Sequence, residues 1–289
     1  MIKIKVPATS ANLGVGFDTL GVALNIYNTF YVEESDKLII EGVDEKYCNS
    51  DNLFVVAFNE TLKRLNVSMN VYVKMESDIP ISRGLGSSAS LIVAGSLAAN
   101  ILNNNMLSME EIFDICTKLE GHPDNIAPAL FGGFTASLLH NDKPYTRKIK
   151  VNDKFRFTVL IPDFEVSTHN ARTVLPKSIS LSDAVSNMSN IVALCFALQD
   201  GDSNMLTISN NDKIHEPYRK SLINEFDIVK KECLKNGAFT FMISGSGSTC
   251  LAISEDKNLS KKINTTKLSN KWQIIDCEIH EDTPIIEVV

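Results

Sequence analysis

The sequence has no uninterrupted apolar run long enough to cross a membrane. A membrane-spanning helix needs about 20 mostly apolar residues. The most apolar window, residues 85–102, is broken by four serines and one asparagine, Ser87, Ser88, Ser90, Ser96 and Asn100. Residues 1–6 alternate apolar side chains with lysine, a pattern typical of a strand and not of a signal peptide. We therefore expect no membrane partner and no export signal.

Closely spaced cysteines are also missing. The six cysteines stand singly, at positions 48, 116, 195, 233, 250 and 277. No C-x-x-C pair occurs, which argues against a zinc ribbon and against a dithiol redox motif. We expect a cytoplasmic protein whose thiols are reduced and buried.

Positive charge is scarce. The chain carries 28 lysines and arginines against 35 acidic residues, which gives a net charge of -7 and a pI near 5.3. Broad binding to nucleic acid depends on a basic surface, so we expect no nucleic-acid partner. A local basic pocket for a small anion remains compatible with this charge.

The common nucleotide-binding signatures are absent. The sequence contains no G-x-x-x-x-G-K-[ST], which excludes a Walker-type phosphate loop. Residues 84–86, Gly-Leu-Gly, lack the third glycine of a dinucleotide-binding turn. The H-R-D and D-F-G elements of protein kinases are missing as well, as are the hydrolase motif G-x-S-x-G and the zinc motif H-E-x-x-H.

The length of 289 residues suggests two domains, and strands and helices mix without a strict βαβ rhythm, which favours an α+β fold. The polar stretch 141–153 predicts a linker, so we place the domains at 1–150 and 151–289. Strands are predicted at 2–6, 26–34, 37–41, 69–75, 133–139, 155–161, 239–243, 249–253 and 273–279. Helices are predicted at 51–65, 87–104, 108–119, 168–174, 182–198, 219–235 and 256–271.

Three loops combine glycine with hydroxyl or amide side chains: Pro7–Asp18, Pro80–Ser90 and Ser244–Ser248. Any one of them alone could be an ordinary tight turn. The second loop is the most informative, because Gly84 and Gly86 precede a helix with no charge near its start. The first N–H groups of that helix need partners, and a glycine-lined concavity with serine hydroxyls can cradle a polyphosphate. Arg83 could add a charge, and the alternative is a capped helix that binds nothing.

The break Glu120–Asn125 is dense in polar side chains. A carboxylate such as Glu120 facing a phosphate loop would suit Mg²⁺, which takes one or two protein oxygens and completes its shell with phosphate and water. Asp124 is expected to cap the next helix, whatever else it does. His122 alone would more often be a satisfied histidine than a ligand.

Arg172 and Arg219 lie in segments of otherwise modest charge. Either one alone is best explained as part of a solvated helix face. As a pair they could grip a carboxylate, because the planar guanidinium donates two parallel hydrogen bonds.

Together these segments resemble the GHMP kinases. Residues 80–89, P-x-x-x-G-L-G-S-S-A, look like the signature phosphate loop of that family, and three ordered motifs span nearly the whole chain. The branch that phosphorylates homoserine is the most similar. Its likeness rests on Thr9–Asp18, Gly121–Pro128, Thr168–Arg172, Glu216–Arg219 and Ile243–Gly247.

This resemblance implies ATP-dependent phosphorylation of the L-homoserine hydroxyl, with ATP and Mg²⁺ as cofactors and a homodimer as the assembly. It implies an N-terminal domain like ribosomal protein S5 domain 2 and a ferredoxin-like C-terminal domain. The triphosphate would be held by Pro80, Ile81, Ser82, Arg83, Gly84, Leu85, Gly86, Ser87, Ser88, Ala89 and Ser90, with Asn52 near the adenine. Ser88 and Glu120 would approach Mg²⁺. Homoserine would be surrounded by Asn12, Asp18, His122, Asn125, Arg172 and Arg219.

The candidate catalytic residues are Glu120, Asp124 and Asn125. Related sugar and mevalonate kinases pair an aspartate base with a lysine, and no lysine stands in the first motif here. We therefore expect no strong general base, since phosphoryl transfer depends mainly on positioning and charge stabilisation.

Two other functions remain open. A GHMP kinase for mevalonate, shikimate or a sugar would share the phosphate loop, but Asp18 would be poorly matched to a substrate without an ammonium group. A non-catalytic ATP-binding sensor would need neither Glu120 nor Ser88. A purely structural domain would leave the three Gly/Ser loops unexplained.

Overall fold

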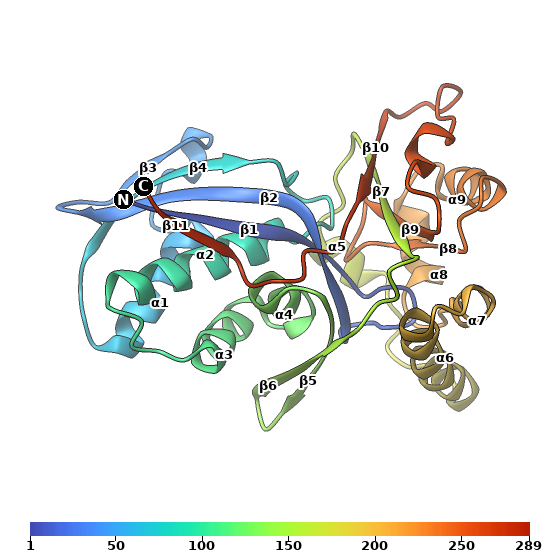
Figure 1. Cartoon of the computed structure of the whole chain (residues 1–289), viewed down its shortest axis with the longest axis horizontal. Coiled ribbons are helices and arrows are strands. Elements are labelled where there is room, and N and C mark those ends of the chain that lie inside the picture. Colours follow the sequence, from blue (N-terminus) through green and yellow to red (C-terminus); the bar gives the residue numbers. More distant parts are fainter.

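The computed structural model describes all residues 1–289 and contains two β-sheets with helices packed against each (Figure 1). The first sheet contains β1 (Ile2–Ala11), β2 (Leu20–Ser35), β3 (Ile39–Glu41), β4 (Asn70–Ser77), β5 (Phe134–His140), β6 (Lys143–Ile149) and β11 (Ile285–Val288). Its order is β11-β1-β2-β4-β3, and β5 pairs with both β2 and β6. The second sheet contains β7 (Arg156–Pro162), β8 (Thr240–Ile243), β9 (Cys250–Ser254) and β10 (Trp272–Cys277), in the order β10-β7-β9-β8.

Four helices accompany the first sheet: α1 (Leu53–Leu65), α2 (Ser87–Leu102), α3 (Met109–Glu120) and α4 (Pro123–Phe131). Figure 1 shows them gathered on one side of that sheet. The second sheet is accompanied by α5 (Thr168–Thr173), α6 (Leu181–Asp200), α7 (Ser203–Ser209), α8 (Glu216–Arg219) and α9 (Phe226–Lys235). Short 3₁₀ turns are η1 (Glu45–Tyr47), η2 (Lys220–Leu222) and η3 (Leu259–Lys261). This mixture confirms the predicted α+β class.

Helix α2 lies closest to the rest of the N-terminal core because its residues are small. A methyl group added at Gly95 would lie 2.1 Å from the backbone oxygen of Phe54 in α1. Helix α3 begins with the predicted capping box, in which Ser108 and Glu111 bond each other's backbone N–H groups. These local signals fix where the loops between the helices begin and end.

The core between the sheets joins the two halves of the chain. One cluster of 22 buried residues combines Leu20 and Leu24 of β2 with Phe157 and Val159 of β7 and Leu198 of α6. Apolar burial of this size stabilises the relative placement of the two sheets. The loops at their junction are therefore held in fixed positions.

The last strand returns to the first sheet. β11 pairs antiparallel with β1, from Ile2 opposite Val288 to Lys5 opposite Ile285. A salt bridge between Lys3 and Glu287 supports this pairing. The domain division between residues 150 and 151 stays a prediction. The first sheet also contains β11, which comes from the C-terminal half of the chain.

Helix α6 is long and apolar enough, by length and composition alone, to cross a membrane. Its inner side chains Leu194, Ala197 and Leu198 pack in the core between the sheets. A core helix passes the same composition test.

Three element predictions were wrong. No α-helix spans 256–271; only η3 forms there, because Asp256 and Asn264 bond nearby backbone N–H groups and stabilise turns instead. The helix predicted at 219–235 begins only at Phe226, as α9. Arg219 is the last residue of α8, residues 220–222 form η2, and Glu225 before α9 has a left-handed conformation. Part of the predicted linker 141–153 is strand β6, which pairs with β5.

Candidate active site

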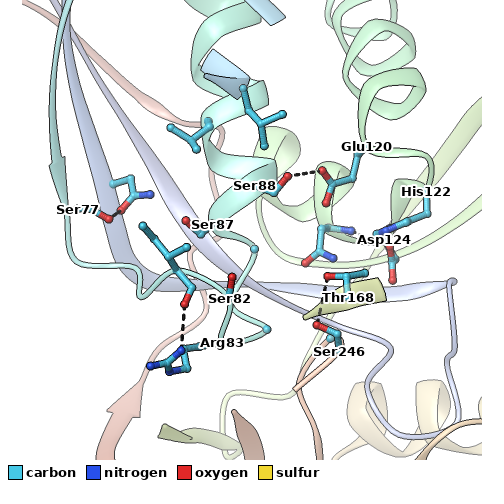
Figure 2. A pocket seen from close by; sticks show the side chains of 18 of the residues that line it. Ser77, Ser82, Arg83, Ser87, Ser88, Glu120, His122, Asp124, Thr168 and Ser246 are labelled. Carbon is cyan, nitrogen blue, oxygen red and sulfur yellow. Dashed lines mark hydrogen bonds and ion pairs between the residues drawn. The ribbon is translucent and has the colours of Figure 1, made fainter. Parts of the chain in front are cut away.

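The three glycine-containing loops meet at a cavity of about 390 Å³. Ser244 Oγ lies 2.6 Å from the backbone oxygen of Gly84 and 2.8 Å from Ser10 Oγ, so the third loop contacts both of the others. Figure 2 shows the start of α2, the end of α3 and the Ser246 loop facing one another across this cavity. Predicted site residues that line it are Asn12, Asp18, Asn52, Ile81, Ser82, Arg83, Gly84, Gly86, Ser87, Ser88, Glu120, His122, Asp124, Asn125, Arg172 and Arg219.

The start of α2 is open toward the cavity. Its N-cap is Gly86, which has φ 69° and no side chain to bond the first N–H groups. Ser87 and Ser88 follow immediately and line the cavity. An uncapped helix N-terminus attracts anions through its free N–H groups and its dipole. This end of the cavity can therefore bind phosphate.

Four residues of the predicted phosphate loop do not line the cavity. They are Pro80, Leu85, Ala89 and Ser90. Leu85, Ala89 and Ser90 are buried, and Ser90 bonds Asn28 on β2. The guanidinium of Arg83 is already engaged, because it bonds the backbone oxygen of Pro162 and pairs with Glu165 at 3.2 Å.

Ser88 and Glu120 form a pair on the cavity wall. Ser88 Oγ donates to Glu120 Oε2 at 2.7 Å (Figure 2). Burial raises the pKa of Glu120, while the hydrogen bond from Ser88 and the neighbouring His122 act in the opposite direction. A hydroxyl and a poorly solvated carboxylate beside a phosphate-binding helix end are hard oxygen donors that fit Mg²⁺.

Asp124 does not cap α4; the N-cap is His122, and Asp124 is already inside the helix. Pro123 supplies the fixed φ that starts the helix two residues earlier than predicted. The Asp124 carboxylate is 1% exposed and lies 2.5 Å from His122 Nδ1. Burial lowers the pKa of His122, but the hydrogen bond with Asp124 and its charge outweigh this and raise the pKa overall. Asp124 therefore both lines the cavity and orients the His122 ring.

Asn125 also has a defined orientation. Its Oδ1 accepts a hydrogen bond of 2.7 Å from Thr9 Oγ1. The amide oxygen is thereby occupied, which leaves the Nδ2 hydrogens as the donors available to a ligand in the cavity. An amide cannot take up a proton at neutral pH, so Asn125 can position a ligand but cannot serve as a base.

Opposite charges gather at the other end of the cavity. Asp18 and Arg172 form a bidentate pair with N–O distances of 3.0 and 3.2 Å. Arg219 is 2% exposed, and its Nε and Nη1 bond the backbone oxygens of Ala171 and Gly245. Burial and the neighbouring Arg172 lower the pKa of Arg219 to about 10, so the guanidinium is still charged at neutral pH.

Asn12 connects this charged end to the third loop. Its Nδ2 donates to the oxygen of Gly245 at 2.7 Å, and its Oδ1 accepts from the backbone N–H of Asp18. Asn12 thus fixes the backbone from which Asp18 projects. Asn52 has a similar local role, because it caps α1 through Phe54 and bonds the oxygen of Tyr47.

An apolar part of the cavity was missed by the sequence reasoning. Six side chains form its walls: Phe30, Val43, Tyr47, Leu53, Met75 and Leu91. They come from β2, η1, α1, β4 and α2 and from the segment after β3. In sequence Phe30, Leu53, Met75 and Leu91 belong to ordinary alternating or helical patterns. Val43 and Tyr47 lie in a segment with no predicted element, so no local signal distinguishes any of the six.

Comparisons with known proteins match both halves of the chain. Residues 52–133 match the model of the GHMP kinase N-terminal domain, and residues 198–264 match that of the GHMP kinase C-terminal domain. A homoserine kinase of Clostridium botulinum strain Okra is 43% identical over 285 residues, covering 96% of each chain. One of Clostridium acetobutylicum is 39% identical, covering 99% of this chain and all of that one. The crystal structure of homoserine kinase from Cytophaga hutchinsonii superposes with a TM-score of 0.91 at 30% identity, covering 99% and 97% of the chains.

Proposed function

The chain belongs to the GHMP kinase family, within it to the homoserine kinases, and on this basis we propose how its cavity performs the reaction. The reaction is ATP-dependent phosphorylation of the L-homoserine hydroxyl, which gives O-phospho-L-homoserine, a step in L-threonine biosynthesis. The observation that carries the assignment to this cavity is its division into two ends. One end is an uncapped helix N-terminus, and the other holds Asp18, Arg172 and Arg219. The unpaired thiols suit a reducing compartment, so a cytoplasmic location is part of this proposal.

ATP lies with its phosphates on the start of α2 and its base in the apolar part of the cavity. Backbone N–H groups after Gly86, with the hydroxyls of Ser87 and Ser88, bind the phosphate oxygens. Phe30, Tyr47 and Leu91 provide apolar contact for the adenine ring.

L-homoserine lies at the charged end. Arg172 and Arg219 bind its carboxylate, and Asp18 binds its ammonium group. In the structure Asp18 and Arg172 bond each other, so a zwitterion that inserts between them replaces one opposite-charge contact with two. Asn125 Nδ2 is oriented to donate to the reacting hydroxyl or to the transferred phosphoryl group.

Ser88 and Glu120 would hold Mg²⁺ when it is bound, and the ion would neutralise charge on the phosphates. No side chain here is placed as a strong base. The carboxylate of Asp124 is buried and already hydrogen-bonded to His122, and Asn125 is an amide. The protein acts by aligning the hydroxyl with the phosphoryl group and by excluding water, which suits a loose transition state.

The test is ADP release by the purified protein with Mg·ATP. We expect turnover with L-homoserine and at least about tenfold lower kcat/KM with D-homoserine, L-serine, mevalonate, shikimate and galactose. Turnover with another alcohol in preference to L-homoserine would contradict the substrate assignment. ATP binding without any turnover would instead favour a sensor.

We also propose a homodimer built on α6. Its outward face carries an apolar stripe at helical spacing, with side chains 49% to 80% exposed: Leu181, Val185, Met188, Val192 and Phe196. No charged residue occurs between Asp183 and Asp200. An exposed apolar face of this length is typical of an interaction site. An uncharged stripe can pair with its own copy across a two-fold axis without bringing like charges together.

Light scattering coupled to size-exclusion chromatography should give twice the chain mass of 31.9 kDa. Val192→Glu places a charge in the stripe and should give the monomer mass. Ile228→Glu is the matched control, because Ile228 is 60% exposed on α9, outside the stripe. A monomeric wild type, or a dimer unaffected by Val192→Glu, would contradict the proposal.

A further inference from the structure

A buried polar cluster lies behind the loop that carries Asp18. It consists of Asn187 on α6 and of Asp212 and His215 in the segment before α8. All three are buried, and His215 is fully inaccessible. None of them lines the cavity, so none contacts a ligand there directly.

The cluster forms hydrogen bonds to two successive backbone carbonyls of the first glycine loop. His215 Nε2 lies 2.7 Å from the oxygen of Gly14, and Asn187 Nδ2 lies 3.4 Å from the oxygen of Val15. Gly14 has φ 68°, and a methyl group added there would lie 2.3 Å from Asn210 Oδ1. The loop is therefore bonded and closely packed just before Phe17 and Asp18.

The same cluster fixes the start of α8. The Asp212 carboxylate accepts hydrogen bonds from the backbone N–H groups of Ile214, His215 and Glu216 at 3.1, 2.8 and 2.6 Å. Asn187 bonds Asp212 Oδ1 and accepts from the backbone N–H of Lys213. Because α8 ends at Arg219, this turn sets the position of that guanidinium.

An aromatic ring completes the connection. Phe17 stacks on the His215 ring with centroids 5.4 Å apart. The guanidinium carbons of Arg219 and Arg172 lie 5.1 and 5.8 Å from the centre of the Phe17 ring. A single packed unit thus holds Asp18, Arg172 and Arg219 relative to one another.

Burial lowers the pKa of His215, although the charge of Asp212 acts against this. The ring is therefore neutral at physiological pH, and one of its nitrogens carries the only hydrogen. The carbonyl of Gly14 requires that hydrogen on Nε2. Nδ1 is buried without a hydrogen-bond partner. Leaving a lone pair unpaired there costs less free energy than leaving an N–H unpaired would.

We infer that His215 is a positioning residue for the amino-acid substrate: its Nε2–H, supported by Asn187 and Asp212, holds the first loop so that Asp18 and Arg219 meet the two charged groups of L-homoserine. This inference rests on the proposed function. It predicts that loss of the Nε2–H donor weakens substrate capture and leaves ATP binding intact, because the side chains of Asn187, Asp212 and His215 make no hydrogen bond to the phosphate loop.

Two substitutions separate the effect of the Nε2–H donor from the effect of the aromatic ring. His215→Phe keeps a ring against Phe17 but removes the hydrogen bond to Gly14. His215→Gln loses the ring but places an amide N–H near the position of Nε2. We expect His215→Phe to raise KM for L-homoserine by about 10- to 100-fold, with KM for ATP changed less than about threefold. His215→Gln should recover most of this loss.

The matched control is His280→Phe. His280 also bonds a backbone oxygen through Nε2, that of Thr283 at 3.2 Å, but the segment it holds, residues 280–283, carries no residue that lines the cavity. Both KM values should stay unchanged in this variant. If His215→Phe does not fold, Asn187→Leu removes the donor to Val15 and Asp212 and is expected to shift the same KM.

The outcomes are distinguishable. If the wild type turns over L-homoserine and His215→Phe folds with an unchanged KM for it, the inference is wrong while the proposed function stands. Equal increases in both KM values, or no recovery in His215→Gln, would mean a merely structural role and would also overturn it. Absence of wild-type turnover with L-homoserine would overturn the proposed function and the inference together.

Discussion

Glu120→Gln should lower kcat by about 10²–10³-fold and raise the Mg²⁺ concentration needed for half-maximal activity. The substitution keeps the shape of the side chain and its contact with Ser88 Oγ, 2.7 Å away, but removes the negative charge. Burial raises the pKa of Glu120, so its wild-type charge is lost as pH falls through that raised pKa. Activity of the wild type should therefore need more Mg²⁺ at lower pH, and the variant should lack this dependence. Steady-state rates over a Mg²⁺ series at two pH values measure both effects.

The control for this substitution is Glu110→Gln, on the same helix but exposed to solvent. It should leave kcat and the Mg²⁺ requirement unchanged. An unaltered Mg²⁺ requirement in Glu120→Gln would mean that Glu120 does not hold the ion.

Gly84→Ala should lower kcat/KM for ATP by about 100-fold or more and destabilise the fold by about 2–4 kcal/mol. Gly84 has φ 76°, and an added methyl group would lie 2.2 Å from the backbone oxygen of Ser244 and 2.9 Å from that of Gly247. Backbone atoms cannot rotate away as a side chain can, so the phosphate loop and the third loop must separate. Urea unfolding together with steady-state kinetics measures the two effects.

Gly237→Ala isolates the cost of the backbone conformation. Gly237 also has a positive φ, 101°, but an added methyl group would meet nothing within 4 Å. It should lose about 1–2 kcal/mol of stability and keep full activity. Similar activities in the two variants would show that contact between the loops is not needed for catalysis.

Local chemistry in the sequence was enough to predict the parts of the site that depend on backbone turns. Gly84 and Gly86 both adopt positive φ, and Ser88 and Glu120 meet although 32 residues separate them. The two glycines stand directly before a helix with no charge near its start, and this combination identified the loop. The pairing of Asp18 with Arg172 could be expected from their charges but not from their spacing of 154 residues.

Some errors arose from an unpredicted local contact and others from a tertiary one. Asp124 was expected to cap a helix, but His122 lies within reach and takes its carboxylate. The sequence suggested that Arg83 adds a positive charge to the phosphate loop. In the fold its guanidinium bonds the carbonyl of Pro162 and pairs with the carboxylate of Glu165. The cluster of Asn187, Asp212 and His215 gave no signal at all, because its members lie in an amphipathic helix and a polar loop.

The pairing of β11 with β1 has a consequence for synthesis on the ribosome. β1 is made well before its partner on the outer side, residues 285–288, leaves the ribosome. Until then β1 is an edge strand with unpaired N–H and C=O groups, and such edges bind other strands readily. Lys3 and Lys5 stand on this strand, and lysine on an edge is a known deterrent to wrong pairing. In the folded chain Lys3 forms a salt bridge with Glu287. The lysine charge that discourages wrong pairing of the exposed β1 edge therefore later helps to hold β11 on that edge.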